Sequence, residues 1–350
     1  FVIFQYLLSN SFFSFLTAFL FLLLGSHAAT VYWISSVGHL FASFFALFAL
    51  WLYIKWSENQ NVFYFACSVI SAFIAPLFHE SGIIAPLLVI LYGIVVSGFV
   101  AKKDKSGYLH YIFYILSILV YVLLKIISHS FWSAGDYSYN LARLPFNIFG
   151  NIFGFLGFVF VGYPSLSLYQ IARDSAKNNL LIVGVCIVFA IIIASLIYNK
   201  VYNNLNKKNK EITLLSLLLF LVPLLPFLPL GNIAPRYIYL GSFGAILFAV
   251  FILQRFYESI NSSYKYASWF IVILVPLIVA LIQVKQLQET NLDWQNAGVV
   301  TNNFVQYMND SFEDLKLGQI GKPDFYFVNV PKTYKTAFTF PVDVADAAWL

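Results

Sequence analysis

The chain has 350 residues, of which 61% are hydrophobic and only 10% are charged, and its formal net charge is +5 at pH 7. Soluble domains contain about 45–50% apolar and about 25% charged residues, so this composition excludes an ordinary soluble protein and indicates a membrane protein. Loop lysines account for the positive charge, and no basic patch with interleaved aromatic residues lies outside the apolar segments, so we expect no nucleic-acid partner.

Apolar stretches that approach or exceed the roughly 18 residues needed to cross a bilayer recur along most of the chain. We therefore predict an all-α polytopic membrane bundle. Phe1 already lies in an apolar run with no basic region before it, and the final "VADAAWL" shows no turn or cap, so we expect a fragment truncated at both ends. The predicted apolar segments are 1–24, 37–55, 61–78, 82–100, 108–127, 146–163, 180–198, 212–230, 237–254 and 266–284.

The polar break "GSHAATVYWISSVGHL" separates the first two segments and contains His27 and Trp33. Both are candidates for contact with a substrate, although a single loop histidine is more often structural. His27 and His39 lack the close spacing of metal ligands, so the sequence assigns no metal site here.

The stretch "PLFHESGIIAPLL" carries His79 and Glu80 between two apolar runs. Glu80 therefore lies in a tight turn between helices or is buried in the bundle, and His79 or Arg236 is its expected partner. It could act as a base, a metal ligand or an acceptor for a sugar hydroxyl. The alternative is a helix cap, in which Glu80 and Ser81 accept from the first N–H groups of the next helix.

Two features follow in the middle of the chain. The stretch "SHSFWSAGDYSYNLAR" contains Asp136 as its only acid, among aromatic residues that could stack on a sugar ring.

The segment 146–163 has repeated glycines and two asparagines, which suit a re-entrant or interfacial hairpin better than a straight helix. If it does not cross, about nine spanning helices remain, and ten loop lysines and arginines share the cytoplasmic face against four outside.

Arg236 and Tyr237 lie in "GNIAPRYIYLGSFG", between two strongly apolar runs. A guanidinium keeps its charge and would cost at least ~2.5–3.5 kcal/mol at the bilayer centre, so Arg236 needs water or an anion. At the membrane surface, beside the N-terminus of the next helix, it fits a lipid phosphate. The alternative is an interfacial anchor, in which Arg236 snorkels and Tyr237 belongs to an aromatic belt.

The last part of the chain has ordinary polarity. An amphipathic helix is predicted there, and the β-rich runs "DFYFVNV" and "TAFTF" follow it. We therefore predict a transmembrane domain over 1–285 and the start of a small external α/β domain, also truncated, over 286–350. The residues on one face of the amphipathic helix are Val300, Phe304, Met308, Phe312 and Leu315.

Three stretches, in this order, resemble signatures of the polytopic C-superfamily glycosyltransferases related to the transmembrane and tetratricopeptide-repeat O-mannosyltransferases. The first break is similar to "H-P-V-H-T-E-A-V-A-W-I-S-G-R-x-D-L-L", with matches that include His27 and Trp33. "FHESGIIAPLLVILY" resembles "SKE-x-A-x-x-x-P-L-L-L-L-L-Y" at Glu80 and Pro86. "APRYIYLGSFG" resembles "ERYLYLPS-x-G" at Arg236. The matches cover about two thirds of the chain.

The resemblance implies a sugar carried on a polyprenyl phosphate and transferred, usually with inversion, to a protein or glycan hydroxyl at the external face of a bacterial inner membrane. It leaves the need for a divalent metal open. Because the family's acidic catalytic motif lies in the first external loop, we expect the catalytic base before Phe1. The candidate residues are Arg236 and Tyr237 for the donor phosphate, and Glu80, His79, His27, Trp33 and Asp136 for the substrates.

Two alternatives stay open. A transporter or lipid flippase would use Glu80 and Arg236 as a charged pair along a substrate path. A catalytically silent relative could serve as an assembly scaffold, since the chain has Ala29 and Pro235 where the family carries glutamate.

Overall fold

The computed structural model describes residues 1–100, 109–129, 143–178, 205–260, 265–315, 330 and 333–339. The chain divides into two compact units, Phe1–Leu281 and Ile282–Leu350, and the division falls inside the helix α13. In chain order, the elements are α1 (Val2–Leu8), α2 (Ser11–Leu23), the 3-10 helix η1 (Gly25–His27), α3 (Ala28–Tyr32), η2 (Ile34–Ser36), α4 (Val37–Asn59), α5 (Val62–Phe78), η3 (Glu80–Ile83), α6 (Ile84–Val100), α7 (Tyr111–Ile127), α8 (Leu144–Phe160), α9 (Pro164–Asn178), α11 (Lys207–Leu224), η7 (Pro235–Ile238), α12 (Tyr239–Ile260), α13 (Lys265–Leu315), β1 (Thr333–Tyr334) and β2 (Ala337–Phe338).

Several helices have the length and composition of membrane spans. Among the described residues, three stretches are long and apolar enough to cross a bilayer: Ile34–Asn59, Pro235–Ile260 and Ser268–Ser311. The pair Ser11–Leu23 and Gly25–Tyr32, bent by 49°, gives a fourth if it forms one span. The expected all-α, multi-pass membrane protein is confirmed by these helices. The expected number of about nine spans is not, because α5, α7 and α8 are shorter apolar helices.

The predicted span 1–24 is wrong as a single helix, because the chain breaks at Ser9 and Asn10. Ser9 has a left-handed φ of 52° and ends α1. The Asn10 side-chain oxygen accepts from the amides of Phe12 and Phe13, at 3.0 and 3.3 Å, and this N-cap begins α2. The predicted segment 180–198 lies outside the described residues.

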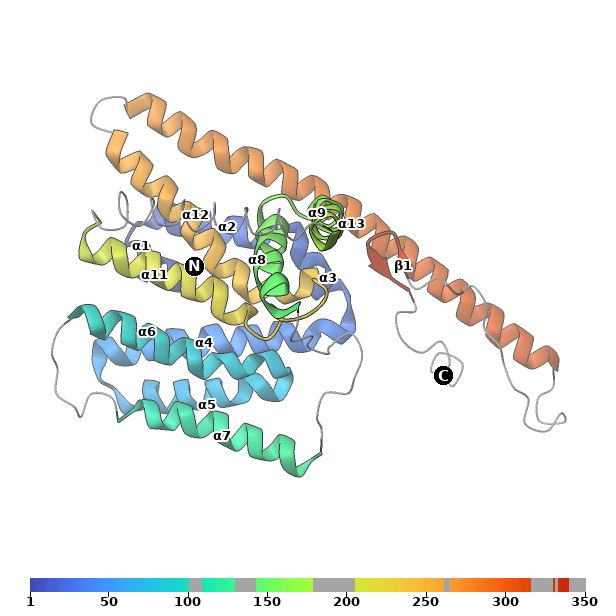
Figure 1. The fold of residues 1–350 in the computed structure, drawn as a ribbon, viewed down its shortest axis with the longest axis horizontal. Coiled ribbons are helices and arrows are strands. Elements are labelled where there is room, and N and C mark those ends of the chain that lie inside the picture. Colours follow the sequence, from blue (N-terminus) through green and yellow to red (C-terminus); the bar gives the residue numbers. More distant parts are fainter. Residues whose placement is uncertain are drawn as a thin grey trace. The chain divides into compact units, whose positions relative to one another are not determined.

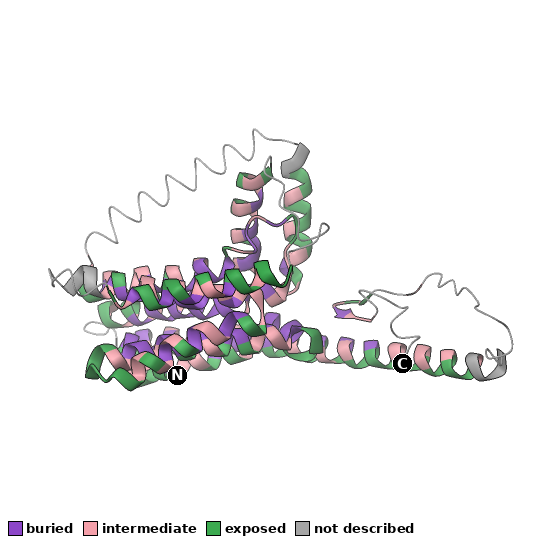
Figure 2. Ribbon diagram, turned by 90° about the horizontal axis from the view of Figure 1, so that it is seen from below, coloured by how far each residue is buried: buried purple, intermediate pink, exposed green. Residues whose placement is uncertain are grey.

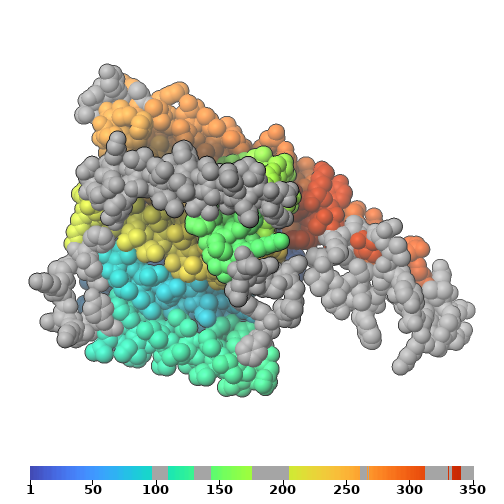
Figure 3. Space-filling view, in the orientation of Figure 1, coloured from blue at the N-terminus to red at the C-terminus, as the bar shows by residue number. Residues whose placement is uncertain are grey.

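Six helices of the first unit, α4 to α7, α11 and α12, run alongside one another in alternating directions (Figure 1). In the space-filling view, α7 forms the outermost layer of this bundle (Figure 3). The helices α4, α6 and α12 begin at one end of the bundle, where α5, α7 and α11 end; we call it the η7 end. The helix α8 runs across the bundle direction (Figures 1 and 2).

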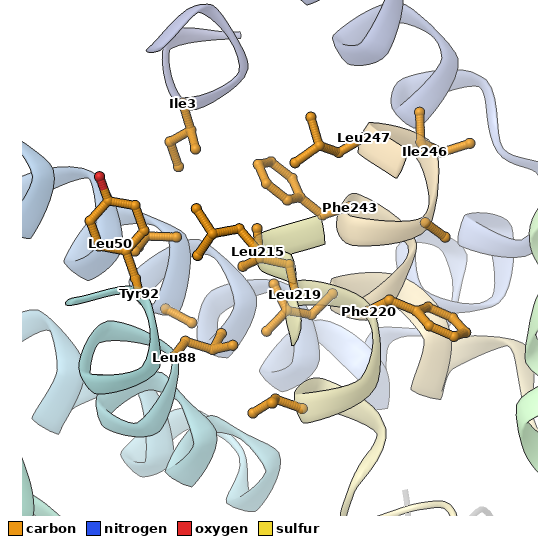
Figure 4. Close-up of a cluster of buried hydrophobic side chains, with 14 of the residues drawn as sticks. Ile3, Leu50, Leu88, Tyr92, Leu215, Leu219, Phe220, Phe243, Ile246 and Leu247 are labelled. Carbon is orange, nitrogen blue, oxygen red and sulfur yellow. The ribbon is translucent and has the colours of Figure 1, made fainter. Parts of the chain in front are cut away.

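The core of the first unit is formed where α1, α4, α6, α11 and α12 meet (Figure 4). Leu50, Leu219 and Leu247 are among its buried side chains. The outer faces of the helices are exposed (Figure 2), and they too carry apolar side chains, as Phe44 on α4 and Leu119 on α7 are 57% and 54% exposed. Apolar residues on both the inner and the outer faces are expected for helices that contact lipid.

In the second unit, a two-stranded hairpin packs on its part of α13. The strands are antiparallel and pair Thr333 with Phe338. The Phe338 ring lies 6.2 Å from the ring of Trp294, and Thr336 Oγ1 donates to Asp293 Oδ2 at 2.8 Å. The predicted amphipathic helix is the end of α13, whereas the β-rich run 324–329 lies outside the described residues, so the small α/β domain stays a prediction.

The helices α11 and α12 cross in close contact at Gly244. A Cβ atom at this position would lie 2.3 Å from the backbone nitrogen of Phe220 and 2.5 Å from the carbonyl carbon of Leu219. Small residues permit such crossings between membrane helices, where dispersion contacts replace the hydrophobic effect as the driving force. Gly150 on α8 provides the contrast, because a Cβ atom added there would meet no other atom within 4 Å.

We expect Gly244→Ala to destabilise the protein by about 1–3 kcal/mol, because the added methyl meets backbone rather than a movable side chain. Gly150→Ala should be neutral or stabilising by up to about 1 kcal/mol, since alanine favours the helix. Thermal unfolding of both variants in nanodiscs measures the difference, and equal midpoints would contradict this description of the crossing.

Candidate functional site

The backbone between α11 and η7 leaves the helical conformation over residues 225–234, at the η7 end of the bundle. Pro226 and Pro229 favour this break, because proline has no N–H to donate to a helix. Two asparagines of α8 supply donors instead: Asn147 Nδ2 donates to the Pro229 carbonyl at 3.1 Å, and Asn151 Nδ2 donates to the Leu228 carbonyl at 2.9 Å. This non-helical stretch leads into η7, the 3-10 helix that carries Arg236.

Arg236 lies between two aromatic rings. Its guanidinium carbon is 4.7 Å from the centre of the Tyr237 ring and 5.0 Å from the centre of the Trp33 ring, and Nη2 donates to the Tyr237 hydroxyl at 3.1 Å. Within the described part of the chain, no carboxylate forms an ion pair with Arg236. Among the described residues, the cation is therefore held by π faces and one hydroxyl, which leaves the planar donors that do not bond Tyr237 available for an anion.

Glu80 forms an ion pair with Lys125, at the end of α7, which the sequence did not predict as its partner. Lys125 Nζ lies 2.5 Å from Glu80 Oε1, and the two side chains are 28% and 35% exposed. Arg236 faces aromatic rings instead, and His79 caps η3 by accepting from the Ser81 amide at 3.2 Å through Nδ1. The N-cap residue of η3 is therefore His79, one position before the residue that the sequence suggested.

A cavity of about 690 Å³ opens at the η7 end; Glu80, His79 and Tyr237 line it, whereas Arg236 lines a separate, much smaller pocket behind Tyr237. This volume lies within the range of about 300–1,000 Å³ that is usual for ligand pockets. The rings of His39 and His79 stack in its wall with centroids 3.6 Å apart, and Phe227 stacks on Tyr237 at 4.2 Å. Its lining includes His39, His79, Glu80, Lys125, Phe227 and Tyr237.

The structure brings together most of the residues predicted for the site. Trp33, Tyr237 and Arg236 are in direct contact, and Glu80 and His79 share the cavity with Tyr237. His27 is different. It is 6% exposed, its Nε2 lies 2.8 Å from Ser242 Oγ, and its ring packs on Tyr239, so it connects η1 to α12 within the core. Asp136 lies outside the described residues.

The sequence reasoning missed Lys125 as a member of the site. A single lysine near the end of an apolar segment was a usable signal, because a cation there requires a partner or the membrane surface. His39 was considered only as a metal ligand, and its stacking on His79 could not be deduced from residues 40 positions apart. No protein-family model, curated protein or solved structure matches the chain.

The ion pair between Lys125 and Glu80 should couple α7 to the turn before α6. We expect Lys125→Met and Glu80→Gln each to destabilise the protein, and the double variant to lose less than the two losses combined, with a coupling energy of about 0.5–1 kcal/mol because both groups are partly exposed. Unfolding free energies of the four proteins give this value. Additive losses would contradict the pairing. The ion pair of Lys55 and Glu58 is the matched control, because it joins residues of the same helix and not two different elements.

The pKa of His79 is lowered from its usual value of 6.5, mainly by burial and further by the positive charges of Arg236 and Lys125, while Glu80 opposes the shift. Below pH 6.5 the unfolded chain therefore gains a proton that the folded protein does not take up, and stability falls as the pH falls. Between pH 7.5 and 5.5, the unfolding midpoint of His79→Asn should fall less than that of wild type. Parallel curves would show that His79 does not contribute.

Proposed function

We propose that the chain is a membrane-embedded glycosyltransferase that moves a sugar from a polyprenyl-phosphate donor to a protein or glycan acceptor. The observation that carries the proposal is the guanidinium of Arg236, which has aromatic partners and no carboxylate among the described residues, and which contacts Tyr237 in the wall of a cavity of about 690 Å³. A planar guanidinium can donate to two phosphate oxygens at once, which suits a lipid-linked phosphate better than a lysine would.

In this reaction, the bond between the anomeric carbon and a phosphate oxygen breaks, and the electron pair stays on the phosphate. The acceptor oxygen forms the new bond to the anomeric carbon, and its proton passes to a base. Arg236 stabilises the negative charge that develops on the departing phosphate. Glu80, fixed by Lys125, accepts hydrogen bonds from sugar hydroxyls, and the aromatic side chains Phe227 and Tyr237 face the sugar. The base is not assigned to a residue of this chain.

The distribution of charge supports the orientation that the proposal requires. Lys55 at the end of α4, Lys208 at the start of α11 and Arg255 near the end of α12 all lie at the end of the bundle opposite η7 (Figure 1). A basic end faces the cytoplasm. We therefore propose that the η7 end faces outward, and we retain the external C-terminal region as an expectation from the sequence. The expected hairpin within 146–163 is wrong, because Leu144–Phe160 form one continuous helix, but the crosswise path of α8 supports the interpretation of this segment as one that does not cross the membrane (Figure 1).

The contacts favour a transporter less than they favour a transferase. That reading predicts a charged pair between Glu80 and Arg236, whereas Glu80 pairs with Lys125 and Arg236 lies against Trp33. A scaffold protein could have the same fold without binding a donor, and it is distinguished from a transferase by the experiment on Arg236.

In the full-length protein, we expect Arg236→Lys to reduce transfer from a purified lipid-linked sugar roughly 10- to 100-fold, because lysine keeps the charge but cannot donate through a planar fork. Arg236→Ala should lose more. Arg255→Lys, at the opposite end of the bundle and paired with Glu258, is the matched control. Wild-type turnover by the Lys variant would reject the phosphate role and favour a membrane anchor, which tolerates lysine.

A further inference from the structure

The non-helical segment that precedes η7 depends on α8 for its hydrogen bonds. Three consecutive carbonyls, of Leu228, Pro229 and Leu230, accept from Asn147 and Asn151, which are one helical turn apart. Asn151 is fully buried and Asn147 is 2% exposed. In an apolar environment, a carbonyl without a donor costs several kcal/mol, so these two amides determine whether the segment can stay non-helical.

The orientation of both amides is fixed in turn by α9. The Tyr169 hydroxyl donates to Asn151 Oδ1 at 2.6 Å, and Arg173 Nη2 donates to Asn147 Oδ1 at 3.1 Å. Arg173 Nη1 also donates to the Tyr169 hydroxyl at 2.9 Å, which closes the network. Because both amide oxygens accept from fixed donors, both amide nitrogens must point at the carbonyls.

The same network lies directly beside the segment that carries Arg236. A Cβ atom at Gly154 would lie 2.7 Å from Ile233 Cδ1 and 2.9 Å from a ring carbon of Tyr169, so α8, α9 and the segment meet at this glycine. Phe227 immediately precedes the three carbonyls that accept from α8, and its ring stacks on Tyr237 with an angle of 6° between the rings. Tyr237 in turn holds Arg236.

We propose that the hairpin of α8 and α9 is a clamp that positions Arg236 for the phosphate, with Asn147, Asn151, Tyr169 and Arg173 as positioning residues. The proposal rests on the proposed function, because it assigns the network to the phosphate site. If the clamp loosens, the segment that carries η7 can shift, and Arg236 shifts with it. The affinity of the folded protein for phosphate then falls, in addition to any loss of stability. A purely structural network would lower stability and leave the affinity of the folded protein unchanged.

The test compares two tyrosine variants that each lose one hydroxyl. Tyr169→Phe removes the donor to Asn151, and Tyr114→Phe removes a buried hydroxyl that donates to Ser68 Oγ at 2.7 Å, between α7 and α5. Both are reconstituted in nanodiscs and matched for folded fraction. The probe is undecaprenyl phosphate, with undecaprenol, which lacks the phosphate, as the lipid control. Hydrogen exchange of the amides in 231–238 is measured on the same samples.

We expect Tyr169→Phe to weaken binding of undecaprenyl phosphate roughly three- to ten-fold, with faster exchange in 231–238, and Tyr114→Phe to change neither. The clamp is rejected if the two variants bind alike or if exchange in 231–238 is unaffected by Tyr169→Phe. Absence of phosphate-dependent binding in wild type would instead reject the proposed function. In that case, faster exchange in Tyr169→Phe alone would still show that the network holds the segment, but not that it serves a phosphate.

Discussion

The permanent charge of Arg236 is the constraint on which the site depends. A guanidinium cannot be neutralised by losing a proton, so a chain that places one between two apolar helices must bring it to a polar boundary or surround it with compensating groups. Here the helical path is interrupted at the end of the bundle, and the rings of Trp33 and Tyr237 compensate the charge without a carboxylate from the described part of the chain. This arrangement uses one guanidinium donor, for the Tyr237 hydroxyl, and leaves the others available, whereas a bidentate ion pair would occupy more of them.

The interruption that accommodates Arg236 creates a second requirement. Carbonyls after the end of α11 must find donors, and the crosswise hairpin of α8 and α9 supplies them through Asn147 and Asn151. Gly154 of α8 belongs to the same arrangement, since it lets Tyr169 and Ile233 approach the helix. Two features that look unrelated in the sequence, an arginine between apolar runs and an asparagine pair in a glycine-rich segment, are thus connected through one stretch of backbone.

The sequence predicted the class of fold and several members of the site, but not their contacts. Apolar segments were sufficient to identify a helical membrane bundle, and Arg236 was identified from its charge between two apolar runs and from the resemblance of its surroundings to a family signature. The break at Ser9 and Asn10 was missed because a run of apolar residues outweighed a single N-cap, whose two hydrogen bonds act locally. Lys125 was missed because periodicity does not tell which helix a polar residue will face. The contact between Trp33 and Arg236 joins residues about 200 positions apart, and no spacing rule reports such a contact.

The proposed function requires that Arg236 binds the phosphate of a polyprenyl-linked donor at the η7 end of the bundle. An electron cryo-microscopy structure of the full-length protein, in nanodiscs that contain undecaprenyl phosphate, would show this contact directly. We expect phosphate density within hydrogen-bonding distance, about 2.7–2.9 Å, of two guanidinium nitrogens of Arg236, with the ring of Trp33 still on its face. Phosphate density elsewhere, or Arg236 paired with a carboxylate of the protein, would contradict this role.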